Sequence, residues 1–274
     1  IKSSGGYNPY ALSWYLDIMA PGWNALIEDD YEAVFPLPCS VKFGIRYIAT
    51  PVFLQQLGIF SPDKLPDGII NEFVEYVPDF YWLIDLSTAQ KIDNDRFISA
   101  NRTNYELDLS GSYEFLWEKF SVHCRRNIDR SYRNKFEIVS DIKPCEISEL
   151  FRKNAGEKIR GIKARDYKRL NELMDYCVKN KKGRILGIRN SGNNIIYGNF
   201  IVEIKGRKTM LFVVNTQESR DYRLGYRVVN EIIKESAGTR TILDFAGSSI
   251  PSIASFMESF GSTVVPFYRN YCNR

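Results

Sequence analysis

Residues 207–249 have the sequence RKTMLFVVNTQESRDYRLGYRVVNEIIKESAGTRTILDFAGSS. Met210–Val214 is an apolar run of strand length, and Thr241–Phe245 is a second one that Gly247 closes. Between them, apolar side chains recur at the spacing of one helix face, and Ala237-Gly238-Thr239 ends the pattern. These apolar residues are Leu224, Val228, Val229, Ile232 and Ile233. The stretch therefore predicts a strand, a turn, a helix and a second strand.

The turn of this unit is polar and basic. Asn215–Ser219 reads as a polar turn, and the segment from Arg220 to Gly225 follows it directly before the helix. A helix N-terminus offers free backbone N–H groups and the positive end of the helix dipole, which suit an anion. Arg220 and Arg223 add guanidinium groups suited to phosphate. The alternative is an ordinary α/β unit with solvated arginines, in which Asn215 merely ends a strand.

Composition limits the possible classes of protein. The chain has 274 residues, so one large or two medium domains are expected. It is 44% hydrophobic and 14% aromatic, which predicts a well-filled core and argues against disorder. Its 37 basic and 33 acidic residues give a net charge of +4, which argues against a general nucleic-acid binder. A small anionic substrate or a local basic patch remains open.

The five cysteines are scattered and show no CxxC spacing. We therefore expect neither a metal site nor a disulfide framework, but reduced thiols in a cytoplasmic protein. No apolar run is long enough to span a membrane, and no signal peptide is visible, although the start at Ile1 leaves a removed leader open. His123 is the only histidine, and neighbouring Cys124 points away from it on a helix, so no Ser–His–Asp or Cys–His constellation is apparent.

The pattern along the chain predicts two domains, 1–135 and 136–274. The first half mixes antiparallel strands with helices. It includes a strand at Lys42–Thr50, a loop at Asn94–Asn104 and a long helix or helix pair at Gly111–Arg133. The second half follows the order ααβββαβαβ after a strand at Phe136–Ser140. Its expected helices before the central one are Glu146–Ile159 and Asp166–Lys179, its meander strands are Arg184–Arg189, Ile195–Ile204 and Thr209–Val214, and a helix Ile250–Phe260 and a strand Thr263–Tyr268 end it.

This order and the turn motif resemble the GNAT acyltransferases. In that family a turn patterned (Q/R)xxGx(G/A) cradles the pyrophosphate of acyl-CoA, and the strand before it diverges from its neighbour to pair with the pantetheine amides. The matching residues here are Arg220, Arg223 and Gly225, with an arginine where the pattern has its first glycine. The resemblance implies a donor along strand 209–215, contacting Asn215, with its phosphates at the turn.

Short segments spread over nearly the whole chain carry a closer resemblance. They are Ser13-Trp14-Tyr15-Leu16-Asp17, Phe35-Pro36-Leu37-Pro38, Gln55-Gln56-Leu57-Gly58, Arg125-Arg126-Asn127-Ile128, Asp244-Phe245-x-Gly247-Ser248 and Phe260-Gly261. Together they resemble the FemAB-like, peptidoglycan aminoacyltransferase-like branch of the GNAT superfamily, in a short form common in Bacteroidetes-type bacteria. The resemblance implies an α/β protein of the α+β type, with a mixed sheet and tandem GNAT-like domains. It also implies transfer of aminoacyl groups from charged tRNA to a cell-wall precursor peptide.

Several side chains are candidates for the chemistry. Asp244 ends the strand after the central helix and is a candidate general base; the alternative is a cap of the next helix. Tyr268 is a candidate proton donor to the leaving group. Arg126 and Arg130 share a helix face with Arg133 and are candidates for binding a phosphate, a nucleotide-linked precursor or tRNA; the alternative is a solvated face.

Two functional hypotheses follow. The first is an acyl- or aminoacyltransferase that uses acyl-CoA or aminoacyl-tRNA as donor and a small-molecule or peptide amine as acceptor, without a tightly bound cofactor. The second is a non-catalytic GNAT-fold module that binds a nucleotide-linked ligand or a partner protein. The family pattern has glycine at Arg223 and an acidic residue at Ala246, and both departures favour the second hypothesis.

Overall fold

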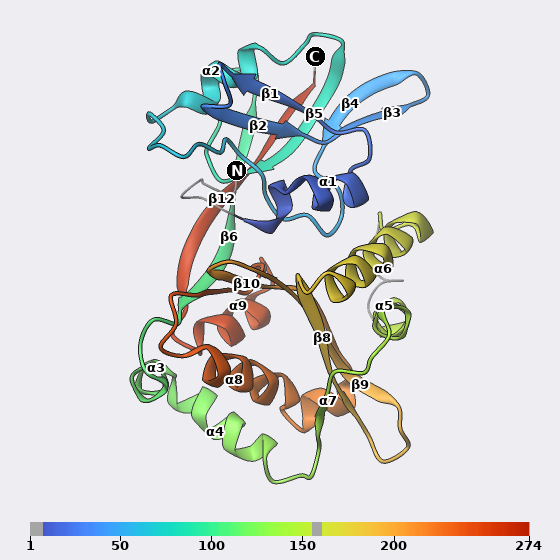
Figure 1. Ribbon diagram of the computed structural model, residues 1–274, viewed down its shortest axis with the longest axis vertical. Coiled ribbons are helices and arrows are strands. Elements are labelled where there is room, and N and C mark those ends of the chain that lie inside the picture. Colours follow the sequence, from blue (N-terminus) through green and yellow to red (C-terminus); the bar gives the residue numbers. More distant parts are fainter. Residues whose placement is uncertain (1–7, 155–160, 274) are drawn as a thin grey trace. The chain divides into compact units, whose positions relative to one another are not determined.

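The computed structural model describes residues 8–154 and 161–273, and the chain divides into two compact units (Figure 1). Unit 1 comprises Ile1–Thr103 and Pro266–Arg274, and unit 2 comprises Asn104–Val265. Strands β6 (Ile98–Asp108) and β12 (Thr263–Asn273) each have residues in both units. Within the described residues, ten strands follow the order β3-β4-β5-β12-β6-β11-β10-β9-β8-β7 in one mixed sheet, and β1 and β2 form a second, two-stranded sheet.

Unit 2 contains the strand–helix–strand stretch that the sequence singles out. Its further strands are β7 (Ile138–Val139), β8 (Gly183–Arg189), β9 (Ile195–Ile204), β10 (Arg207–Asn215) and β11 (Ile242–Asp244). Its helices are α3 (Tyr113–Lys119), α4 (Val122–Ser131), α5 (Pro144–Asn154), α6 (Ala164–Lys179), α7 (Gln217–Asp221), α8 (Leu224–Ser236) and α9 (Pro251–Glu258). The predicted order of helices and strands after residue 136 is thus confirmed except for α7, an additional short helix before α8. Residues 155–160 of the helix expected at 146–159 lie outside the described residues.

Helices cover both faces of the unit 2 sheet. On one face α8 packs with α3, α4 and α9 against β8, β9 and β10, in a core that includes Leu116, Val228 and Phe260. On the other face α5 contacts β9 and β10, and α6 contacts β8. There the rings of Phe151 and Phe212 lie 4.8 Å apart. The central helix therefore has one long buried side, as its apolar spacing predicts.

In sequence, the two units divide between residues 103 and 104 and between residues 265 and 266, whereas the predicted boundary lies between residues 135 and 136. Helices α3 and α4 contribute Leu116, Cys124 and Ile128 to the same core as α8, and Figure 1 shows α4 alongside α8. Apolar side chains buried in one core hold these helices to unit 2. Whether the two units are copies of one fold stays a prediction.

All three residues of β11 pair with β10, but only with the first three residues of β10. The parallel register runs from Arg207 opposite Ile242 to Thr209 opposite Asp244. The next residue, Phe245, donates its backbone N–H to the carbonyl of Tyr105 on β6 at 3.0 Å. From Met210 to Asn215, β10 continues with β9 on its other side. The predicted divergence of the two strands is therefore confirmed.

Unit 1 has its own core. Its elements are the short 3-10 helix η1 (Pro9–Ala11), helices α1 (Ser13–Met19) and α2 (Ile69–Glu75), and strands β1 (Asn24–Glu28), β2 (Ala33–Leu37), β3 (Cys39–Lys42), β4 (Ile45–Ala49) and β5 (Tyr81–Thr88). The rings of Phe35 and Phe73 meet edge to face in the core at 6.3 Å. No helix in the described parts of the chain is both long and apolar enough to cross a bilayer.

One prediction for this half is incomplete and another is wrong. The strand expected at Lys42–Thr50 is present as β4, but the sequence pattern does not predict its hairpin partner β3 or the reversal at Phe43 and Gly44. The loop expected at Asn94–Asn104 is mostly strand β6. Residues 98–103 of β6 are exposed or half-buried, and most of them are polar. Hydrophobic periodicity therefore does not reveal this part of the strand.

The packing of α5 on β9 generates a stability prediction. A Cβ at Gly198 would lie 2.6 Å from Cγ2 of Ile147, so Gly198→Ala should lower the free energy of unfolding by about 1–3 kcal/mol. Gly192→Ala is the matched control, because its nearest atom is the flexible amide of Asn194 at 3.1 Å, and should change it by less than about 0.5 kcal/mol. Urea unfolding measures both. Equal stability of the two variants would contradict the close approach of α5 to the sheet.

Candidate functional site

The N-terminus of α8 in unit 2 has the features of an anion site. The helix begins at Leu224 with Arg223 as its N-cap, and no side chain in the described residues caps it. Leu224 and Gly225 are buried in the first turn. The first N–H groups of a helix have no partner within it, and they lie at the positive end of its dipole. A bound anion is one way to satisfy them.

Arg223 has a backbone conformation that glycine adopts more easily. Its φ is 60°, in the left-handed region. A left-handed L-residue costs roughly 1–2 kcal/mol, so the backbone here keeps the shape of a glycine turn despite the arginine. The side chain is exposed, and its Nη1 donates to the carbonyl of Arg220 at 3.0 Å. Arg223 stands where the GNAT pattern has its first glycine, and it adopts a conformation that glycine takes with less strain.

The four predicted donor-binding residues lie together. Arg220 is exposed and donates from Nη1 to the carbonyl of Asn215, and from Nη2 to Oε1 of Gln217 at 3.0 Å. A Cβ built on Gly225 would lie 3.6 Å from Nδ2 of Asn215. The Oδ1 atom of Asn215 is buried and has no hydrogen-bond partner among the described residues. A buried acceptor without a partner is costly, which makes this corner a candidate for a ligand donor group.

The polar turn expected at Asn215–Ser219 is instead the entry to a short helix. Helix α7 spans Gln217–Asp221, and the Thr216 hydroxyl caps it by accepting from the N–H of Ser219 at 3.2 Å. A threonine N-cap supplies the partner that the first helical N–H groups lack. This helix orients Arg220 toward the end of β10.

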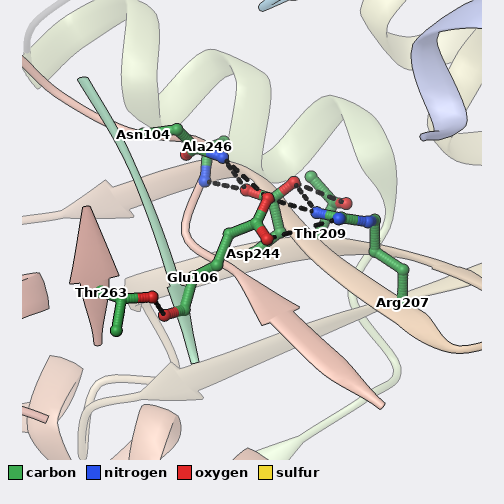
Figure 2. A network of polar contacts seen from close by, with 7 residues as sticks. All are labelled: Asn104, Glu106, Arg207, Thr209, Asp244, Ala246 and Thr263. Carbon is green, nitrogen blue, oxygen red and sulfur yellow. Dashed lines mark hydrogen bonds and ion pairs between the residues drawn. The ribbon is translucent and has the colours of Figure 1, made fainter. Parts of the chain in front are cut away.

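Asp244 lies in a buried polar network with side chains from β6 and β10 (Figure 2). It is 1% exposed. Its Oδ2 accepts from Nη1 of Arg207 at 2.9 Å, and its Oδ1 accepts from Nδ2 of Asn104 at 3.0 Å and from the N–H of Ala246 at 2.9 Å. Arg207 Nη1 also donates to Oε1 of Glu106 at 2.8 Å. The network joins three strands at the point where β10 and β11 stop pairing.

Burial raises the pKa of the Asp244 carboxyl, and the charge of Arg207 acts against that rise. Burial by itself would lower the pKa of Arg207, but the hydrogen bonds and charges of Glu106 and Asp244 raise it. We conclude that Arg207 stays charged, with two carboxylates around one guanidinium. The cap interpretation of Asp244 is wrong: α9 has Ile250 as its N-cap without a side-chain bond, and Asp244 binds the backbone two residues on.

The other predicted site residues are not part of this network. Arg126 and Arg130 are exposed on α4 in unit 2. Tyr268 lies on β12 in unit 1, opposite Thr88. Their roles stay predictions. Sequence reasoning missed Arg207 and Glu106, which come together only through pairing across β10, β11 and β6 and therefore leave no local signal in the sequence.

Solved structures share this fold over almost the whole chain. FemX superposes with a TM-score of 0.69 at 12% identity, over 97% of this chain and 93% of FemX. An acetyltransferase of the GNAT family from Colwellia psychrerythraea gives 0.54 at 11% identity, over 99% and 92% of the two chains. L-PGS from Bacillus licheniformis gives 0.51 at 13% identity, over 97% and 92%.

No protein-family model and no curated protein matches the sequence. At identities this low, structural likeness shows a common fold and leaves the substrate open. The resemblance to the FemAB-like branch of the GNAT superfamily is confirmed at the level of fold. The chain is a mixed α+β protein with the large mixed sheet of that fold.

The network around Asp244 generates a prediction that separates a role of this carboxylate in stability from a role as a base in the reaction. Asp244→Asn should lower the free energy of unfolding by about 2–4 kcal/mol, because removing one partner of a buried ion pair leaves the other charge poorly compensated. Glu149→Gln, which removes the partner of Arg152 at 2.8 Å on the surface, should leave the stability almost unchanged, because solvent screens an exposed ion pair. Denaturant unfolding compares the two. Unchanged stability of Asp244→Asn with loss of turnover would instead assign this carboxylate to the reaction as a base.

Proposed function

We propose that this chain is an N-acyltransferase that moves an acyl or aminoacyl group from acyl-CoA or aminoacyl-tRNA to an amine, including the amine of a cell-wall precursor peptide. The single observation that carries the proposal is the divergence of β10 from β11 beside the uncapped N-terminus of α8. Beyond Thr209, β10 has an edge that β11 no longer pairs with, where the backbone of a donor can add hydrogen bonds. The FemX-like and GNAT-like fold supports the same class of reaction.

The donor would lie along β10, with its phosphates at the turn. Asn215 and the first N–H groups of α8 meet there, and Arg220 and Arg223 are exposed beside them. A charge-assisted hydrogen bond to phosphate is stronger than a neutral one, so two guanidinium groups and a helix N-terminus form a suitable anion site. Arg126 and Arg130 would contribute to binding the carrier or the acceptor from α4.

The reaction would be a direct transfer. The acceptor nitrogen attacks the acyl carbonyl carbon, the carbonyl oxygen becomes an oxyanion held by backbone N–H groups, and the carbon–sulfur or carbon–oxygen bond to the carrier then breaks. The amine loses a proton and the leaving thiolate or alkoxide gains one, so the protons balance over the transfer. Positioning and electrostatic stabilisation supply most of such catalysis. The bonded environment of Asp244 suits it to holding the strands more than to taking a proton.

A specific observation favours the second candidate, a non-catalytic module that binds a nucleotide-linked ligand or a partner protein. The guanidinium of Arg220 donates to the carbonyl of Asn215, so it covers the end of the strand on which a donor would lie. Incubation with acyl-CoA or aminoacyl-tRNA and a panel of amines separates the two candidates. Thiol release or loss of the aminoacyl label that depends on the amine supports transfer. Binding of the donor without transfer to any amine supports the module.

The turn generates a prediction for donor binding. Arg220→Ala should weaken donor affinity roughly ten- to a hundredfold, because a charge-assisted hydrogen bond to phosphate contributes about 1.5–3 kcal/mol. Its effect on unfolding should stay under about 1 kcal/mol, since the side chain is exposed. Calorimetric titration with acetyl-CoA, a longer acyl-CoA and charged tRNA measures the affinity. Arg240→Ala, another exposed arginine of unit 2, is the control and should bind as the parent protein does.

Arg223→Gly makes a sharper test of the same turn. Glycine removes the left-handed strain at φ 60°, so the free energy of unfolding should rise by about 1 kcal/mol. Donor affinity should nevertheless fall about tenfold, because the guanidinium is lost while the backbone cradle remains. Melting temperature and calorimetry record the two effects on one sample. Unchanged affinity in both Arg220→Ala and Arg223→Gly would reject a phosphate-binding turn.

A further inference from the structure

The hairpin of β3 and β4 in unit 1 ends in an unusual turn. Lys42 pairs with Ile45, which leaves Phe43 and Gly44 as a two-residue loop. Both have positive φ, 53° and 79°. Such a loop is the type I′ turn that Asn-Gly or Asp-Gly forms readily, because both central positions need a left-handed backbone. A phenylalanine at the first position is therefore locally unfavourable.

Folding does not account for this phenylalanine. Phe43 is 91% exposed, so its ring contributes almost nothing to the core while its backbone bears the strain of a left-handed residue. A bulky non-glycine residue with positive φ is an outlier, and such outliers gather where function requires them. The position therefore holds an aromatic ring in solvent at a local energetic cost.

The residues around the tip form an apolar wedge with positive charge. Val41 and Ile45 are 66% and 53% exposed. In the register Val41 lies opposite Arg46 and Lys42 opposite Ile45, so each face of the hairpin carries one apolar and one basic side chain. Residues 39–49 contain no acidic residue. Figure 1 shows the hairpin projecting from the rest of unit 1.

Aromatic side chains continue this surface at the start of β5. Trp82 is 61% exposed, and the Arg46 guanidinium lies 4.8 Å from the centre of the Phe80 ring. β4 pairs with β5 here, Arg46 opposite Tyr81. Exposed aromatic and aliphatic side chains next to lysine and arginine are the composition of segments that lie in the headgroup region of a membrane.

We propose that the tip of the β3–β4 hairpin inserts into the interface of a bilayer that contains anionic lipids. Phe43 enters the boundary between headgroups and acyl chains, Val41 and Ile45 follow it on the two faces, and Lys42 and Arg46 contact lipid phosphates. An anionic surface attracts nearby basic side chains, and buried apolar area adds to that attraction. The alternative occupant is a second copy pairing along β3, which is an edge strand of the sheet. A four-residue edge strand that carries a lysine resists such pairing.

Vesicle flotation of the full chain tests the proposal. The protein should bind vesicles of phosphatidylcholine mixed with phosphatidylglycerol more tightly than vesicles of phosphatidylcholine alone. Phe43→Asn should weaken binding about 10–100-fold, the effect of losing one buried phenyl ring. Lys42→Gln and Arg46→Gln should each weaken binding about fivefold on the anionic vesicles only.

Phe43→Asn also separates a loss of membrane binding from a loss of folding. Asparagine tolerates the left-handed turn better than phenylalanine, so the melting temperature should stay the same or rise while vesicle binding falls. Tyr76→Asn is the matched control, because it removes another exposed aromatic of unit 1, and it should bind vesicles like the parent protein. No flotation of the parent protein with either lipid mixture would overturn the proposal. A change in oligomeric state by light scattering in Phe43→Asn, with vesicle binding unchanged, would assign the tip to a second copy instead.

Discussion

Arg207 and Asp244 meet where β10 and β11 stop pairing, with 2.9 Å between Nη1 and Oδ2. The parallel register ends at Thr209 and Asp244, and beyond that point the chain after β11 bonds to β6. An ion pair inside the sheet holds the beginning of β10 to the end of β11, so their separation starts at a fixed place. Because a buried charge needs its partner, the network resists sliding of one strand along the other.

The separation and the orientation of α8 depend on each other. Helix α8 follows the short helix α7 in the connection from β10 to β11, and it buries Val228, Ile232 and Ile233 in the core of unit 2. A helix packed over a sheet in this way brings its N-terminus near the end of the strand that precedes it. The first turn of α8 therefore lies close to the end of β10, where a Cβ built on Gly225 would lie 3.6 Å from Nδ2 of Asn215. A rigid core on one side and an open strand edge on the other would give the proposed donor a preformed site, which would lower the entropic cost of binding it.

The sequence predicts the elements of unit 2 well because their signals are local. The helical spacing from Leu224 to Ile233 and the short apolar strands beside it need no knowledge of partners. The outer half of β6 is missed because its side chains are exposed or half-buried and polar, and the hairpin turn at Phe43-Gly44 is missed because phenylalanine is not a turn residue. The candidate site also contains residues that a local motif reveals and residues that only the fold brings together. Arg220, Arg223 and Gly225 form one contiguous motif, whereas Arg207, Glu106 and Asp244 meet only through the pairing of distant strands.

The hairpin tip and the turn before α8, for which we propose functions, each contain an exposed residue with a left-handed backbone. Asp29 and Asn193 have positive φ, but aspartate and asparagine adopt that conformation without much strain. Phe43 and Arg223 have it as well, and neither side chain is buried in a way that would force it there. A residue can keep a strained backbone for two reasons. Its side chain can pack in the core, or its side chain can have a role at the surface. Exposure argues against the first explanation at both positions, but Tyr31 and Lys181 are also exposed with positive φ. The conformation therefore supports a role outside the core at Phe43 and Arg223 only together with the charge and the apolar residues around each of them.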